Sequence, residues 1–124
     1  MTEAWRIVDG ERSVTGPEAA ELVSNQVGKG TLTTYFESDD GRILTVVTNG
    51  IRAMVMLLWG EGDPGEHAVT PGAVGSSDGY VLENGQVDTY EDADTVPLAE
   101  ALDIVRSIID SGTPPSEASW NVDR

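Results

Sequence analysis

The sequence predicts an α+β fold, an antiparallel sheet (a meander of about five to seven strands) with two helices packed on it. Three observations lead to this prediction. Residues 31–59 are rich in β-branched and apolar side chains and are divided by two tight-turn signals. Segments with helical apolar spacing lie before and after this region. The chain has 124 residues without an internal repeat or a linker, so we expect residues 1–124 to form one domain.

The N-terminal part predicts a short strand followed by a helix. Residues 5–8 (Trp-Arg-Ile-Val) are typical of a strand. The helix-start signal combines a capping box from Thr15 to Glu18 with Pro17 in the first turn. Residues 28–30 (Gly-Lys-Gly) mark the end of this helix. Its expected buried stripe consists of Ala19, Ala20, Leu22, Val23 and Val27.

The central part predicts three antiparallel strands joined by two hairpin turns. The turns are Asp-Asp-Gly at 39–41 and Asn-Gly at 49–50, and Asn-Gly is a strong hairpin signal because both residues tolerate positive φ. The second and third strands are nearly continuous in apolar residues, so we expect both to be covered on both faces. The expected strands are residues 31–37, 42–48 and 51–59.

A long irregular loop is predicted next, over residues 60–78. It holds many glycines, two prolines and several acids, and a loop of this length in a compact domain is either functional or mobile. Within it, residues 67–70 fit a short strand. A further hairpin is expected after the loop, with residues 80–82 and 86–90 flanking Glu-Asn-Gly at the turn.

A second helix is expected over residues 97–111. Pro97 stands at its first position and Gly112 follows its last turn, which are common start and stop residues. Beyond a Pro-Pro turn, Trp120 and Val122 indicate a last strand or extended arm. The apolar spacing predicts one buried helix face, formed by Leu98, Ala101, Leu102, Val105, Ile108 and Ile109.

The chain is strongly acidic, with 22 acids, 7 bases and a net charge of −15. This charge repels nucleic acids and anionic membranes, and it attracts basic proteins. General solubility, adaptation to salt and a base composition that disfavours lysine codons are alternative explanations. Evenly spread acids would favour these alternatives, whereas one concentrated acidic face would favour partner binding.

The lack of cysteine and of long apolar segments further narrows the classes of function. The chain has no cysteine, which excludes disulfides and thiolate chemistry. We find neither an apolar stretch of ~20 residues nor a leader pattern, so we expect a cytoplasmic protein that does not enter a membrane.

No residue pattern is typical of catalysis or metal binding. The single histidine, His67, has no recognised nucleophile motif around it. The acidic run at residues 91–94 lacks the spacing of a calcium loop, and its charge instead suits the start of the following helix. We therefore predict no catalytic residue, no metal site and no cofactor. Trp5, Trp59 and Trp120 are expected to be core or half-core anchors, with an exposed interface anchor as the alternative for one of them.

The C-terminal third carries a pattern formed by Asp88-Thr89-Tyr90, Val96-Pro97, Ala99, Ala101, Ser111-Gly112, Pro114 or Pro115, and Trp120. This pattern resembles the first family of immunity proteins from bacterial polymorphic toxin systems (Imm family 1). Ile108 and Ile109 depart from the family, which often has an aromatic residue there, as does Ser111, where threonine is usual. The matching residues also have a structural explanation, because Pro97 would start the helix, Gly112 would cap it and Trp120 would pack across it.

The resemblance implies a protein that binds and neutralises a cognate toxin domain as a one-to-one complex. Such toxins are commonly nucleases or nucleic-acid deaminases, and the acidic surface would occlude their basic substrate cleft. An acidic adaptor or regulatory domain that binds another basic protein is the alternative, and a small carboxylate-pair enzyme is a third hypothesis. We expect the partner to contact the two acidic loops, through Glu61, Asp63, Glu66, His67, Asp88, Tyr90, Glu91, Asp92 and Asp94.

Overall fold

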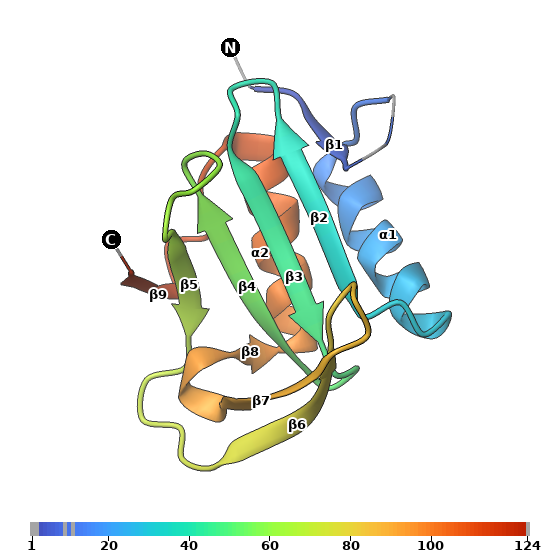
Figure 1. Cartoon of the computed structure of the whole chain (residues 1–124). Coiled ribbons are helices and arrows are strands. Elements are labelled where there is room, and N and C mark those ends of the chain that lie inside the picture. Colours follow the sequence, from blue (N-terminus) through green and yellow to red (C-terminus); the bar gives the residue numbers. More distant parts are fainter. Residues whose placement is uncertain (1–2, 9, 11, 124) are drawn as a thin grey trace.

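The computed structural model describes residues 3–8, 10 and 12–123. An antiparallel sheet carries both helices on one face and a separate two-stranded hairpin at one end (Figure 1). The predicted α+β class, with two helices on an antiparallel sheet, is therefore confirmed. The strand order is β1-β2-β3-β4-β5-β9, and β8 also pairs with β4. The strands are β1 Trp5–Ile7, β2 Thr33–Ser38, β3 Ile43–Thr48, β4 Arg52–Leu58, β5 Glu66–Val69, β8 Val96–Pro97 and β9 Ser119–Val122.

Both predicted helices form, and local signals set their ends. Helix α1 (Gly16–Gly28) begins with the expected capping box, in which the Thr15 and Glu18 side chains each accept a hydrogen bond from the other residue's backbone N–H. Helix α2 (Leu98–Ser111) ends at Gly112, whose φ of 83° is left-handed. The face of α2 buried against the sheet includes Ile104, which was missing from the predicted stripe.

The central meander forms with the predicted turns. The two strands flanking the first turn pair with Glu37 opposite Ile43, and the second turn is closed by Asn49, whose Oδ1 accepts from the N–H groups of Ile51 and Arg52 at 2.9 and 2.8 Å. Gly50 at this turn has a φ of 90°, as the sequence signal requires.

The prediction that two central strands are covered on both faces holds for β3 and is wrong for β4. Strand β3 is buried along most of its length. Strand β4 instead alternates: Ala53, Val55 and Leu57 are buried in the core, and its other residues are partly exposed on the opposite face. The hairpin explains the difference, because it packs against β2 and β3, where Thr33 Oγ1 donates to the Val81 carbonyl at 2.6 Å.

The irregular loop predicted over residues 60–78 contains more regular structure than expected. Strand β5 lies in the sheet between β4 and β9, which confirms the short strand proposed inside the loop. The hairpin strand β6 (Ser76–Val81) also begins earlier than predicted, and it pairs with β7 (Val87–Glu91). A bulge between Ser77 and Tyr80 lets β6, the longer of the two strands, pair with β7. Gly79 lies within this bulge and has a positive φ.

Candidate functional site

The residues predicted to contact a partner are divided between the two ends of the sheet. Glu61 and Asp63 lie in the turn between β4 and β5, at the end away from the hairpin (Figure 1). The residues of β7 and of the short 3-10 helix η1 (Asp92–Asp94) lie at the hairpin end, and β5 runs between the two. The predicted contact residues on β5, β7 and η1 are Glu66, His67, Asp88, Tyr90, Glu91, Asp92 and Asp94.

His67 is the predicted residue around which other charged groups converge. Its Nε2 lies 3.0 Å from Asp94 Oδ1, and its Nδ1 lies 2.7 Å from Asp123 Oδ2. The imidazole therefore joins β5 to η1 and to the segment after β9. Sequence reasoning missed Asp123, because its position depends on the pairing of His67 with Asn121 across two strands that are far apart in the chain.

The surroundings of His67 favour its charged form. Burial alone would lower the pKa of His67, but the hydrogen bonds and charges of Asp123 and Asp94 outweigh it and raise the pKa above the ordinary value of 6.5. The protonated ring can donate to both carboxylates at once, so it acts as a clasp between three segments.

Replacement of His67 by glutamine should remove a pH-dependent part of the stability. A raised pKa means that the clasp contributes fully below the unfolded-state pKa of 6.5 and is lost as pH rises through the folded-state pKa. The difference in unfolding free energy between wild type and His67→Gln should therefore be larger at about pH 5.5 than at about pH 9. Urea unfolding at both pH values measures it, and an equal difference at the two would contradict the clasp.

Asp92 is held within the fold by the hairpin and by Arg52. Its carboxylate accepts from Ser77 Oγ at 2.6 Å and lies 3.8 Å from Arg52 Nε. The same guanidinium donates to the hydroxyls of Thr95 and Thr70 at 2.8 and 3.1 Å. Asp92 therefore helps to fasten η1 and the hairpin to β4.

Tyr90 and Asp88 form a pair on one side of the hairpin. The Tyr90 hydroxyl donates to Asp88 Oδ2 at 3.0 Å, and its ring packs on the buried Tyr80 with centroids 4.7 Å apart. Burial, followed by the Asp88 hydrogen bond, raises the pKa of Tyr90 to about 12. The Tyr90 ring and hydroxyl therefore both contact other side chains of the protein. Glu91, on the same strand, is exposed.

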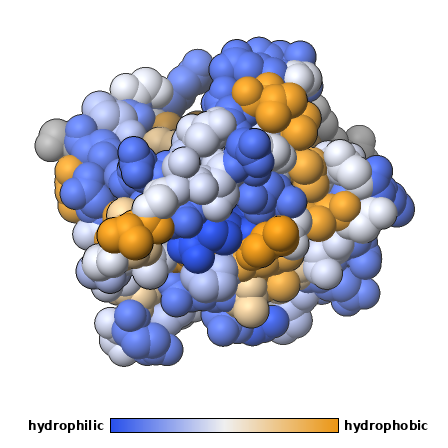
Figure 2. All heavy atoms as spheres, turned by 90° about the horizontal axis from the view of Figure 1, so that it is seen from below, coloured by the Kyte–Doolittle hydropathy of each residue, from blue (hydrophilic) through white to orange (hydrophobic). Residues whose placement is uncertain are grey.

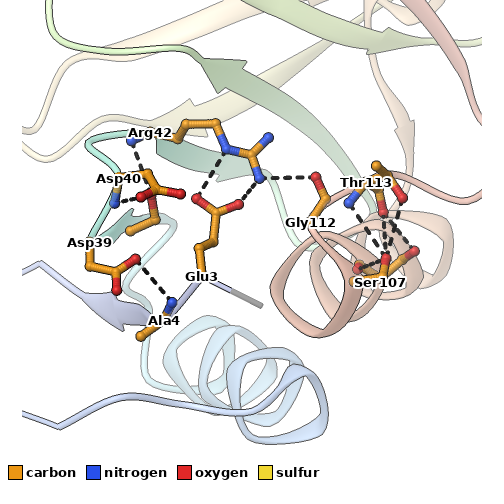
Figure 3. Close-up of polar contacts among 10 residues, drawn as sticks. Glu3, Ala4, Asp39, Asp40, Arg42, Ser107, Gly112 and Thr113 are labelled. Atoms are coloured by element: carbon orange, nitrogen blue, oxygen red, sulfur yellow. Dashed lines mark hydrogen bonds and ion pairs between the residues drawn. The ribbon is translucent and has the colours of Figure 1, made fainter. Parts of the chain in front are cut away.

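A cluster that the sequence did not indicate is centred on Arg42 (Figure 3). Arg42 directly precedes β3, and the β2–β3 turn lies at the end of the sheet away from the hairpin (Figure 1). The Arg42 Nε donates to Glu3 Oε2 at 3.2 Å, and its Nη2 donates to Glu3 Oε1 and, at 2.9 Å, to the Gly112 carbonyl. The guanidinium also lies 5.4 Å from the Trp5 ring centroid and 5.6 Å from that of Trp59. One side chain thus connects the N-terminal segment, the end of α2 and the turn after β4.

Acidic side chains gather beside this arginine. Carboxylate oxygens of Glu3, Asp39 and Asp40 lie within 4.8 Å of one another. Two of these groups have partners in the fold, since Glu3 binds Arg42 and Asp39 Oδ1 accepts from the Ala4 N–H at 3.1 Å (Figure 3). Asp39 and Asp40 are exposed in the β2–β3 turn, where they face solvent.

The three tryptophans have different environments. Trp5 is 1% exposed in the core, and Trp120 is partly buried against it. Trp59 is 59% exposed. The prediction of a core or half-core anchor is therefore confirmed for Trp5 and Trp120. It is wrong for Trp59, which directly follows β4 where the chain leaves the sheet.

Charge alone does not select a contact surface. Exposed acids lie on the helices, among them Glu21 and Glu100, and on the hairpin side of the sheet, among them Asp78 and Glu91. Each arginine in the described part of the chain is already close to a carboxylate. These ion pairs are Arg6–Glu37, Arg12–Glu18, Arg42–Glu3, Arg52–Asp92 and Arg106–Asp103.

The residues that carry the resemblance to Imm family 1 have structural roles. Val96 is fully buried and pairs with Ala53, and Pro97 directly precedes α2. Gly112 caps this helix by donating its N–H to the Ile108 carbonyl at 2.7 Å, and Trp120 packs on the core. These residues therefore position the C-terminal helix.

Neither helix in the described residues combines the length and the apolar character needed to cross a membrane. Comparisons of the chain with protein-family models, curated proteins and solved structures gave no significant match.

Proposed function

We propose that this protein binds and neutralises a cognate toxin domain in a one-to-one complex, as an immunity protein similar to Imm family 1. The observation that carries the proposal is the net charge of −15 on a chain whose described arginines are engaged in internal ion pairs. A nuclease or a nucleic-acid deaminase needs a basic cleft to hold its substrate. Carboxylates of this protein would take the places of substrate phosphates in that cleft.

In this mechanism the protein makes and breaks no bond and needs no metal or cofactor. Long-range attraction between opposite charges sets the rate of association, and closely packed contacts set the rate of dissociation. The protein would act in the cytoplasm, where the nucleic-acid substrate of the toxin is found.

Co-purification with the protein encoded directly upstream tests this function. We expect a one-to-one complex, and stoichiometric loss of the nuclease or deaminase activity of that protein. Association should slow several-fold between about 50 and about 200 mM salt, because the attraction is electrostatic. Absence of a complex, together with unchanged activity, would contradict the proposal.

An acidic adaptor or regulatory domain is the second candidate, because the net charge of −15 would attract a basic protein in that role as well. It shares the expectation of a basic protein partner. It differs in one measurable respect, since the partner would bind without loss of an enzymatic activity.

A further inference from the structure

Trp59 combines high exposure with a fixed position. The side chain is 59% exposed. Its backbone N–H donates to Asp63 Oδ2 at 2.9 Å, which closes the turn after β4. The Arg42 guanidinium lies over its ring, 5.6 Å from the centroid, and Arg42 is itself fixed by Glu3 and Gly112. A large aromatic group held in place before binding loses little conformational entropy when a partner covers it.

The surroundings of Trp59 are acidic. The pairing of Ile43 with Leu58 places the β2–β3 turn next to the β4–β5 turn. The first of these turns exposes Asp39 and Asp40, and the second exposes Glu61. Two described arginines lie near these turns, and both have carboxylate partners. Arg42 donates to Glu3 and to the Gly112 carbonyl, and Arg6 donates to Glu37 Oε1 at 3.0 Å.

We propose that Trp59, Asp39, Asp40 and Glu61 form the docking surface for a basic protein. The Trp59 indole enters an apolar recess of the partner, and the carboxylates meet lysines or arginines at the rim of that recess. Tryptophan is enriched at the energetic centre of interfaces, and charge complementarity identifies the partner as basic. This inference rests on the proposed function, which supplies the partner: the toxin domain encoded upstream.

The hairpin end of the molecule is a weaker candidate for this contact. Ile51 and Val74 are more exposed than Trp59, at 76% and 89%. Figure 2 shows that hydrophobic residues at this end form patches separated by hydrophilic ones. An open depression of about 590 Å³ there is lined mainly by polar groups of the Asn49 turn and of β6. Aliphatic side chains such as valine are also under-represented among residues that dominate binding energy.

Binding kinetics of Trp59→Ala test the docking surface, with a catalytically inactive form of the upstream-encoded protein as the probe. We expect the dissociation rate to rise at least about tenfold. Trp59→Phe should keep most of the affinity, because it keeps an aromatic ring. The control Ile51→Ala removes an exposed side chain at the hairpin end and should leave the rates unchanged.

Charge reversal separates the role of the rim from that of the indole. Glu61→Lys should slow association at low salt and flatten its salt dependence, because it removes attraction at the contact. Glu21→Lys makes the same charge change on α1 and should have a smaller effect. Equal effects of the two variants would argue against carboxylates at the contact.

Amide hydrogen exchange on the wild-type complex gives a measurement that needs no variant. Residues 38–42 and 59–63 should exchange more slowly in the complex than in the free protein. If the wild type binds while Trp59→Ala keeps wild-type rates and these segments gain no protection, the docking surface is wrong and the proposed function stands. If the wild type neither binds nor inhibits the upstream protein, both proposals fail.

Discussion

Replacement of Arg42 by alanine should lower the free energy of unfolding by about 3 kcal/mol. The Arg42 and Glu3 side chains are only 12% and 9% exposed, so the substitution leaves a poorly solvated carboxylate without its cation. It also leaves the Gly112 carbonyl without this donor and removes the cation that lies close to the Trp5 and Trp59 rings. Urea unfolding at pH 7 measures the change.

An exposed ion pair provides the matched control for Arg42. Arg106 pairs with Asp103 three residues earlier on α2, and these side chains are 46% and 66% exposed. Arg106→Ala should therefore change stability by less than about 1 kcal/mol. Equal losses for Arg106→Ala and Arg42→Ala would show that the Arg42 cluster contributes no more than a surface pair.

The cost of Arg42→Ala should also depend on pH. Burial raises the pKa of Glu3, but hydrogen bonds from Arg42 and Ser38 together with the Arg42 charge outweigh it and lower the pKa below 4.5. A carboxyl group whose pKa is lowered by folding stabilises the folded state at pH values above its unfolded-state pKa. This stabilisation is lost as the pH falls through the folded-state pKa. The difference between wild type and variant should therefore shrink as the pH falls below 4.5.

Replacement of Gly16 by alanine should destabilise the protein by about 2 kcal/mol, because it forces the two helices apart. Gly16 begins α1 against the C-terminal half of α2. A Cβ atom there would collide with the Arg106 carbonyl oxygen and lie 2.6 Å from Asp110 Cγ. The Gly16 N–H also donates to Asp110 Oδ1 at 2.6 Å, and a shift of α1 would stretch this bond.

Gly28 at the other end of α1 is the control for Gly16. A Cβ atom at Gly28 would meet no atom within 4 Å, and its φ is not positive. Gly28→Ala should leave stability unchanged or raise it by up to about 1 kcal/mol, because alanine restricts the unfolded chain. If Gly16→Ala were as well tolerated, the close approach of the two helices would not be a packing constraint.

The predictions that succeeded depend on neighbours in the sequence. The Thr15 capping box, the Asn49-Gly50 turn and the Gly112 helix end each involve residues within a few positions of one another. The predictions that failed depend on distant segments. The exposed face of β4 depends on where the hairpin packs, and continuous apolar residues cannot show which strand the hairpin will leave open.

The contacts made by the predicted site residues were harder to foresee than the fold. Sequence reasoning selected acids by their density along the chain, and several of them form hydrogen bonds with other side chains of the same protein, as Asp92 does with Ser77 and Asp94 with His67. The Arg42 cluster was missed because Glu3, Arg42 and Gly112 come from three separate parts of the sequence. A signal for Trp59 was nevertheless available, since it follows a strand and precedes a glycine-rich turn.

The sequence by itself determined the order of helices and strands, the positions of most turns and the excess of negative charge, because periodicity, capping and composition are local or additive properties. Only the tertiary structure decided which tryptophan is exposed, which carboxylates His67 and Arg42 bind, and which turns lie side by side. These features follow from strand register and helix packing, which bring together residues separated by tens of positions in the chain.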